Sequence, residues 1–405
     1  MNDHSEKRAS DTPNPHVSLP LPPTVWVLAD DRPGNTSQSV GLAQALGWSF
    51  TVKELQFTRI ADILKFLLGP FAATRLGLAT DRSATLAPPW PQIVIAAGWR
   101  PAQLACWIKR RSGGQTRLVH LGRKGGHVAA LFDVVVSCSY FHLPPHPRRI
   151  EVAAPLTRIS SHRLQEAAQH WHRLVANAQP PYIMTLVGGA TSRHQFDTTI
   201  AQRLGEELRS FTETIGGSLF VTTSRRTTAP ATAALKSALG EKAYLHEWQP
   251  GLAQDNPYMA FLALADVLIV TGESESMLAE AMATGKPFYI YPLPEKTPSQ
   301  SWRKRLKVWV KDTVVASAYD HNQSDGRAVT SGTRARFCRW LIASGIVRPR
   351  RDLHELHQAL IRRGSASLFG TPLPSPPRPL LCEIDEVAHK VKTLLGFQEE
   401  SVDKT

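Results

Sequence analysis

A turn rich in small and acidic residues lies between an apolar run and a helical pattern in the second half of the chain. Val267–Val270 is apolar and β-rich, and Ser274 or Ser276 can cap the helix that follows. The free N–H groups and the dipole of a helix N-terminus attract phosphate. The order of strand, turn and helix therefore predicts a diphosphate site, with Gly272, Ser274, Glu275 and Ser276 in contact with the ligand.

The acidic residues of this turn allow two interpretations. Glu280 lies one helical turn inside, on the face of Ser276, where it could reach ribose hydroxyls beyond a diphosphate. A purely structural interpretation is that Glu273 and Glu275 complement the positive end of a capped helix. Two carboxylates at that end also repel a diphosphate, so a diphosphate site requires cations nearby.

Arginines follow other predicted strands of the same half. Arg225 and Arg226 lie in the segment Ser224–Thr227, after the apolar run Ser218–Thr222, and Arg193 follows a glycine pair. Guanidinium groups match phosphate oxygens bidentately. Parallel strands place their carboxyl ends at one edge of a sheet, where ligands bind. The complete predicted binding set is Gly188, Gly189, Ser224, Arg225, Arg226, Gly272, Ser274, Glu275, Ser276 and Glu280.

Acidic and histidine side chains in the first half are candidates for a general base. Such a base must come within hydrogen-bond reach of an acceptor hydroxyl, and Asp31, His127 and His142 are the candidates. The loop Asp30–Asn35 lacks GxGxxG, so a nicotinamide cofactor is not expected. No HExxH or other metal-ligand spacing occurs. We expect no cofactor and no metal, with a nucleotide-diphosphate sugar as substrate.

Two tandem sets of strands and helices must position these residues. The first set has strands at Val25–Ala29, Ile93–Ala97, Leu118–Leu121 and Val134–Ser137, and the second has strands at Tyr182–Val187, Ser218–Thr222, Val267–Val270 and Phe288–Tyr291. Continuous apolar strands that alternate with helices indicate parallel sheets covered on both faces. The predicted fold class is α/β, with two Rossmann-like doubly wound domains facing a central cleft.

The length of 405 residues also favours two domains. We predict a disordered tail at 1–23, an acceptor-side domain at 24–160, a nucleotide-sugar domain at 180–300, and a basic, Pro-rich region at 301–405 that packs on both. The four cysteines are far apart and form no CxxC pair, which predicts buried free thiols in a reducing cytosol. No run reaches the roughly 18 apolar residues of a spanning helix.

The basic charge is concentrated near the C-terminus. Residues 301–363 hold fourteen Lys or Arg against five acids, within a net charge of +13. This clustering suits anionic lipid or a phosphorylated acceptor, and a nucleic acid partner is the least expected. Trp302 and Trp309 fall on one face of a predicted basic helix, Trp302–Lys311. That helix could lie on an anionic membrane or dock its apolar stripe on the protein itself.

The segment Asp266–Pro287 resembles the donor-site motif of glycosyltransferase-B enzymes such as the peptidoglycan lipid-intermediate N-acetylglucosaminyltransferase. The wider pattern resembles the mitochondrial-fission "elongated mitochondria" family and its bacterial relatives. The matching pieces are Asp30–Asn35 with Gln38-Ser39, Gly98–Pro101, Gly188-Gly189, Ser224–Thr227, Asn256–Tyr258, Thr271–Met277 and Gly285–Pro287.

This resemblance implies a glycosyltransferase-B-like fold and a likeness to nucleotide-sugar enzymes. Plant members of the family are associated with recruiting a dynamin-like protein to mitochondria. The sequence departs from the family pattern at Gly122–His127 and Phe141–Pro144. Both segments belong to the predicted acceptor side, so the departures concern acceptor chemistry.

Three functions follow from these patterns. The favoured one is a glycosyltransferase that uses a nucleotide-diphosphate sugar, in the cytoplasm or peripheral on the inner membrane face, with an acceptor at or near that surface. The departing diphosphate would be stabilised by helix N–H groups and arginines. The alternatives are an epimerase of the nucleotide sugar and a non-catalytic membrane-associated adaptor. Fold alone does not choose among them.

Overall fold

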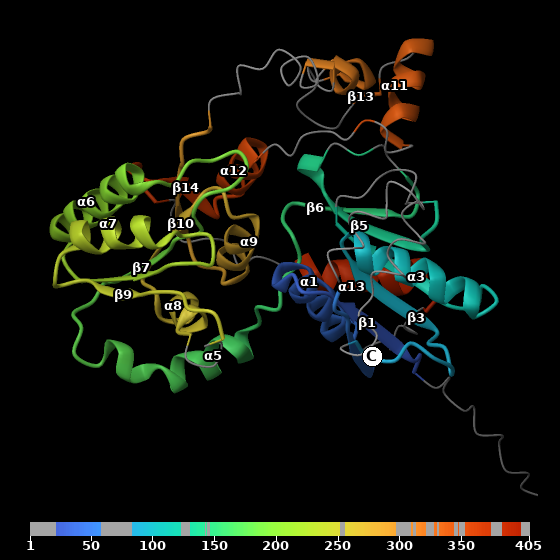
Figure 1. Cartoon of the computed structure of the whole chain (residues 1–405), viewed down its shortest axis with the longest axis horizontal. Coiled ribbons are helices and arrows are strands. Elements are labelled where there is room, and N and C mark those ends of the chain that lie inside the picture. The colour runs from blue at the N-terminus through green and yellow to red at the C-terminus, as the bar shows by residue number, and fades with distance from the viewer. Residues whose placement is uncertain are drawn as a thin grey trace, which may run out of the picture.

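The computed structural model describes residues 22–57, 83–122, 130–141, 143, 146–251, 256–296, 309–310, 313–320, 328–329, 332–343, 347, 353–373 and 383–397. Two α/β units make up most of these residues and lie side by side in Figure 1. Each unit is built on a six-stranded sheet whose strands are all parallel.

The first sheet has the order β2-β1-β3-β4-β5-β6. Its strands are β1 (Val25–Ala29), β2 (Phe50–Glu54), β3 (Ile93–Ala97), β4 (Arg117–Leu121), β5 (Val134–Cys138) and β6 (Arg149–Val152). Because side chains alternate along a strand, one face of the sheet packs on α1 (Pro33–Ala45) and α13 (Glu383–Leu394), and the other packs on α3 (Trp99–Arg111). Burial on both faces explains the continuous apolar strands.

The second sheet has the order β14-β11-β10-β7-β8-β9. Its strands are β7 (Tyr182–Leu186), β8 (Ser218–Thr222), β9 (Tyr244–His246), β10 (Val267–Thr271), β11 (Phe288–Tyr291) and β14 (Ala366–Leu368). One face packs on α6 (Thr198–Ile215) and α7 (Ala229–Leu239). The other packs on α8 (Tyr258–Leu264), α9 (Glu275–Ala283) and α12 (Leu353–Arg362).

The strand order reverses at one point in each sheet. In the first sheet the chain goes from β1 to β2 on one side and then to β3 on the other; in the second, β8 and β9 lie on one side of β7 and β10 lies on the other. At such a reversal the connecting helices leave in opposite directions and open a crevice at the carboxyl ends of the strands. The loops after β1 and β3, and those after β7 and β10, are thereby placed to line a site.

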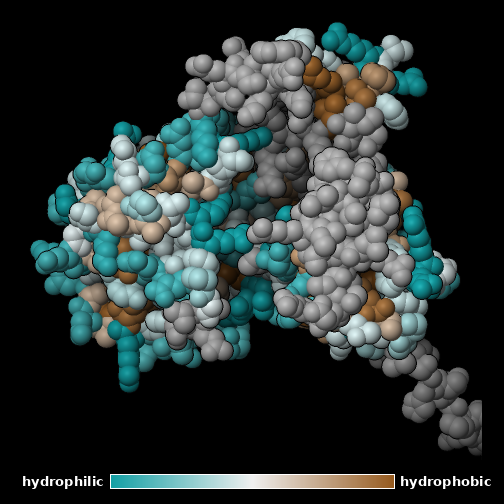
Figure 2. Space-filling view, viewed as in Figure 1, coloured by the Kyte–Doolittle hydropathy of each residue, from teal (hydrophilic) through white to brown (hydrophobic). Residues whose placement is uncertain are grey.

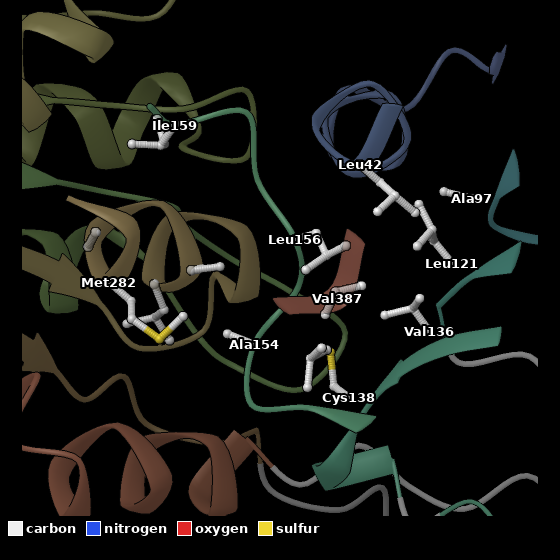
Figure 3. Close-up of a cluster of buried hydrophobic side chains, with 14 of the residues drawn as sticks. Leu42, Ala97, Leu121, Val136, Cys138, Ala154, Leu156, Ile159, Met282 and Val387 are labelled. Carbon is white, nitrogen blue, oxygen red and sulfur yellow. The ribbon is translucent and has the colours of Figure 1, made fainter. Parts of the chain in front are cut away.

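The connection between the units is buried rather than looped into solvent. Residues 152–157 are buried, and Figure 3 shows Ala154 and Leu156 on this segment between Met282 of the second unit and Val387 of the first. A Cβ at Gly41 of α1 would lie 2.1 Å from the carbonyl oxygen of Thr157, so α1 packs directly on the connection. One continuous hydrophobic cluster therefore includes inner faces of both sheets.

The C-terminal helices return to both units. α12 contacts β14 of the second sheet, whereas α13 contacts α1 and β6 of the first. The Glu383 carboxylate at the start of α13 accepts a hydrogen bond of 2.9 Å from the Ala153 N–H of the connection. Between β11 and α12, the described residues include a hairpin of β12 (Tyr319–Asp320) and β13 (Ala328–Val329) and the helix α11 (Thr333–Ala343).

The predicted α/β fold of two doubly wound units facing a cleft is confirmed. In Figure 2 most of the described surface of both units is teal or white, because the apolar strand residues are internal. Cys106, Cys138 and Cys338 are buried and form no disulfide among the described residues. No helix among the described residues has both the length and the apolar character needed to cross a bilayer.

The helix that follows the connection is α5 (Ser161–His170), and a short 3-10 turn, His172–Val175, comes after it. The predicted basic helix lies mostly outside the described residues, which include only its Trp309 and Val310.

Candidate functional site

A cleft of about 990 Å³ lies between the carboxyl ends of the two sheets. Its lining comes from the loops at both strand-order reversals, from the loop after β8, from the ends of β4 and β5, and from the segment after β6. Among the predicted site residues, the cleft is lined by Asp31, Ser224, Arg225, Arg226, Ser274, Glu275 and Ser276, together with Arg193 and Glu273. Residues from distant parts of the chain are thus brought to one cavity.

The second unit supplies a wall suited to an anion. The helix α9 begins at this wall with Ser274 at its N-cap, and the Ser274 side chain makes no capping hydrogen bond. The N–H groups of the first turn are therefore not occupied by that hydroxyl. Arg225 is exposed on the same cleft, beside the partly exposed Arg226. A helix N-terminus and two guanidinium groups form an environment that favours phosphate oxygens.

The Glu273 side chain, part of the acidic turn before α9, is buried and paired with an arginine. Its carboxyl side chain has no exposed surface, and its Oε1 accepts a hydrogen bond of 3.1 Å from Arg226 Nη2. Burial raises the pKa of Glu273 to about 7, although Arg226 opposes the shift. Of the two carboxylates expected to repel a diphosphate, Glu273 is therefore buried away from the cleft and partly neutralised, whereas Glu275 still lines the cleft.

Glycines permit this close packing. A Cβ at Gly188 would lie 2.0 Å from Glu273 Oε1, and one at Gly189 would lie 2.7 Å from the carbonyl carbon of Arg226. Gly189 also has a φ of +100°, which L side chains rarely adopt. Gly188 and Gly189 do not line the cleft. Their role is structural, because their lack of a side chain lets Glu273 and Arg226 approach each other.

Gly272 has a similar structural role. His357 of α12 donates a hydrogen bond of 2.7 Å from Nε2 to the Gly272 carbonyl oxygen, and a Cβ at Gly272 would lie 2.8 Å from the His357 ring. The C-terminal helix therefore packs directly against the turn that begins α9. Leu353 at the start of the same helix lines the cleft.

Glu280 is placed differently from the sequence expectation. It is absent from the cleft lining, and its carboxylate accepts a short hydrogen bond from the Tyr258 hydroxyl. The contact with ribose stays a prediction. Two other motif residues have structural partners: Asp266 accepts from the Tyr182 N–H at 2.7 Å, and Lys286 Nζ donates to the carbonyl of Ala263 at 2.6 Å.

The first unit forms the opposite wall. Asp31 lines it with a largely exposed side chain, 3.8 Å from the Arg100 guanidinium. Asp30 accepts hydrogen bonds from the Asn35 amide at 3.1 and 3.2 Å, and burial raises its pKa. A Cβ at Gly98 would lie 2.6 Å from the same amide. The loops after β1 and β3 therefore meet through Asn35, a cleft residue.

His194 is a cleft residue that the sequence reasoning missed. It is buried, and its Nδ1 lies 3.2 Å from Thr191 Oγ1. Burial lowers the pKa of His194, so the imidazole is neutral near pH 7 and can accept a proton. Its position after the Gly188-Gly189 turn was the available signal. His127 and His142 lie outside the described residues, so their roles as bases stay predictions.

Glu273 should impose a pH dependence on stability. A folded pKa of about 7 against an ordinary value of 4.5 means that its stabilising contribution is complete below 4.5 and lost as pH rises to about 7. Relative to Glu273→Gln, wild type should lose about 3 kcal/mol of unfolding free energy across this window. Urea unfolding at several pH values measures the difference. If the unfolding free energies of the two proteins changed with pH in the same way, the raised pKa of Glu273 would be contradicted.

The two doubly wound sheets and the cleft between their carboxyl ends define a glycosyltransferase-B-like protein. This class holds the cavity at the junction of its two units, where both strand-order reversals meet. The chain belongs to the mitochondrial fission ELM1 family, whose model matches residues 33–321.

Two proteins resemble this chain in sequence. The mitochondrial fission protein ELM1 of Arabidopsis thaliana is 27% identical over 222 residues, which cover 49% of this chain and 51% of that protein. The uncharacterized protein RP120 of Rickettsia prowazekii (strain Madrid E) is 25% identical over 305 residues, 67% of this chain and 83% of that protein. The match thus spans about half the length of the plant protein.

Solved structures of similar architecture are distant in sequence. The UDP complex of S. aureus MnaA has a TM-score of 0.43 at 11% identity, covering 93% of this chain and 98% of that one. The Neisseria meningitidis UDP-GlcNAc 2-epimerase bound to UDP-GlcNAc has a TM-score of 0.39 at 10% identity, covering 84% of this chain and 98% of that one. Arabidopsis thaliana UGT89C1 with UDP has a TM-score of 0.41 at 13% identity, covering 91% of this chain and 99% of that one. The fold class rests on this chain's own strand order.

Proposed function

We propose that this protein is a glycosyltransferase that takes its sugar from a nucleoside-diphosphate donor. The observation that carries the proposal is the convergence of the α9 N-terminus with Arg225 and Arg226 on one wall of the cleft. This wall offers N–H donors and guanidinium groups to a diphosphate. As the bond to the sugar breaks, the same groups stabilise the charge on the departing diphosphate.

The opposite wall would hold the acceptor. Asp31 reaches the cleft and is the described carboxylate proposed to accept a proton from the acceptor hydroxyl. A cavity of about 990 Å³ has room for a nucleotide sugar together with part of an acceptor. We propose an acceptor that is phosphorylated or attached to an anionic membrane surface, because the chain carries a net charge of +13.

A second candidate is epimerisation of the nucleotide sugar itself. The supporting observation is His194, a buried imidazole on the donor side of the cleft whose lowered pKa leaves it neutral. A base on that side could remove a proton from the bound sugar without any acceptor. One structural relative by fold, from Neisseria meningitidis, is described as a UDP-GlcNAc 2-epimerase.

One assay separates these functions. The full chain is incubated with a panel of nucleotide sugars, with and without a lipid extract, and products are resolved by mass and by chromatography. A glycosyltransferase releases the nucleoside diphosphate and forms a heavier acceptor only when the extract is present. Conversion of the sugar without an acceptor favours the epimerase. Absence of turnover with every sugar overturns both and favours a non-catalytic adaptor.

Arg225 provides a test of the donor wall. Arg225→Ala should weaken a nucleoside diphosphate by about 1.5–3 kcal/mol, the usual value of a hydrogen bond to a charged group. The bare nucleoside should bind almost as before, since it offers no phosphate. Calorimetric titration compares the two ligands. Equal weakening of both would place Arg225 away from the diphosphate.

A further inference from the structure

The three most exposed large apolar side chains of the described residues all fall between residues 309 and 340. Trp309, Phe337 and Trp340 are 64%, 58% and 56% exposed, whereas the other exposed large apolar side chains reach at most 44%. All three belong to the segment between β11 and α12, outside both α/β units. Exposure of aromatic side chains to water is unfavourable, so such a group indicates an interaction surface.

Two of these residues form a ridge on α11. Phe337 and Trp340 are three positions apart and therefore lie on the same helix face, and their rings stack at 5.8 Å with an interplanar angle of 22°. Arg334 and Arg336 are exposed too. The helical rotation of about 100° per residue places one arginine on each side of the ridge. We call Arg334, Arg336, Phe337 and Trp340 the α11 face.

The fold of this segment does not depend on the α11 face. The opposite side of α11 carries Ala335 and Cys338, which are buried, and Cys338 packs with Ala318 and Val347 in a small core of its own. The buried side chains of Ala335 and Cys338 thus already anchor α11 to the rest of the segment. The aromatic residues on the outer side are available for another partner.

The charge around this surface favours an anionic partner. Between residues 301 and 363 the sequence has fourteen Lys or Arg and five acids, and the first turns of α11 contribute Arg334 and Arg336. Aromatic rings prefer the headgroup level of a bilayer, where arginines can reach lipid phosphates. A convex helix face with an apolar ridge between cations matches such a surface.

We propose that the α11 face docks the protein on an anionic lipid bilayer. In Figure 1 α11 projects beyond the two sheets on the upper side, the side on which α12 also lies. The described residues in that part of Figure 2 show brown beside teal, apolar next to charged. Docking through this face would hold the cleft, which α12 helps to line, near the membrane.

Flotation of the full chain with vesicles tests the proposal. Vesicles of phosphatidylcholine containing phosphatidylserine should carry the protein at low salt, and pure phosphatidylcholine should not. Phe337→Ser combined with Trp340→Ser should abolish flotation. Arg334→Gln combined with Arg336→Gln should weaken partitioning about 30-fold, because each cation near an anionic surface contributes about fivefold. Added salt should release the wild-type protein.

Matched control variants test whether flotation depends on the α11 face in particular or on exposed apolar and charged side chains in general. Leu131→Ser with Leu394→Ser removes two apolar side chains that are 44% and 43% exposed elsewhere, and Arg209→Gln with Lys242→Gln removes two exposed cations from the second unit. Both control proteins should float like wild type.

Loss of flotation in the controls equal to that in the α11 variants would overturn the proposal. It would also be overturned if wild type ignored anionic vesicles at low salt but bound a single-stranded oligonucleotide through Phe337 and Trp340. None of these outcomes depends on nucleotide-sugar turnover.

Discussion

Arg226→Ala is expected to impair folding stability and ligand binding together. Arg226 pairs with the fully buried Glu273 carboxylate at 3.1 Å and also lines the cleft. Because Arg226 lowers the pKa of Glu273, its removal forces the buried carboxyl either to stay protonated or, at higher pH, to ionise without its partner. Loss of one partner from a buried ion pair typically costs 3–5 kcal/mol. Because one side of Arg226 is open to solvent, we expect the lower end, about 3 kcal/mol.

The binding effect of Arg226→Ala follows from the same geometry. A guanidinium held in place by Glu273 loses less freedom when a phosphate arrives. We therefore expect nucleoside diphosphate affinity to fall by at least the roughly 1.5–3 kcal/mol of one charged hydrogen bond. Chemical unfolding at several pH values measures stability, and calorimetry measures binding.

Two further variants separate these effects. The double variant Arg226→Ala with Glu273→Gln removes the stranded charge, so it should recover most of the stability and none of the affinity. Arg225→Ala should lose affinity and keep stability, because Arg225 is exposed and its side chain is not the partner of Glu273. A double variant that stayed as unstable as Arg226→Ala would contradict the role of the buried pair.

Gly189→Ala is expected to have the second large effect. The residue has a φ of +100°, and a Cβ there would lie 2.7 Å from both the carbonyl carbon and oxygen of Arg226 and 2.9 Å from the Thr227 nitrogen. These are backbone atoms, so no side chain can rotate away. The added methyl group must therefore push the loop after β8 away from the loop after β7. We expect a loss of about 3 kcal/mol, from strain and overpacking combined.

Gly370→Ala is the matched control. Gly370 has a φ of +88°, and a Cβ there has no heavy atom within 4 Å. It shares the unfavourable backbone conformation without the collision, so it should cost about 1 kcal/mol. Thermal or urea unfolding compares the two proteins. If both variants lost the same stability, the loops after β7 and β8 would not be packed as closely at Gly189 as the structure shows.

The sequence predicted the central strands well because they are buried on both faces. β1, β3, β8 and β11 have the bounds expected from their continuous apolar runs. β2 and β9 were missed. β2 is partly exposed and mixes polar with apolar residues, and β9 has three residues; both lie at a sheet edge. Such strands depend on pairing with a neighbour rather than on local apolar character.

The candidate site was only partly predictable. Turn residues at the ends of apolar strands pointed to Arg225, Arg226 and Ser274, since the parallel fold brings those ends together. The pairing of Glu273 with Arg226 could not be foreseen, because it depends on the close approach of two glycines from another strand. The α12 helix and its His357 contact were also missed, since they join the site from a remote segment.

The wall formed by the α9 N-terminus and its arginines is proposed to bind a nucleoside diphosphate. Calorimetric titration of the full chain with UDP, GDP and ADP, each beside its own nucleoside, measures whether it does. At least one diphosphate should bind, with an affinity about tenfold or more above that of its nucleoside, equivalent to one charged hydrogen bond. Failure of all three to bind at millimolar concentration, or equal affinity for the nucleoside, would contradict the account.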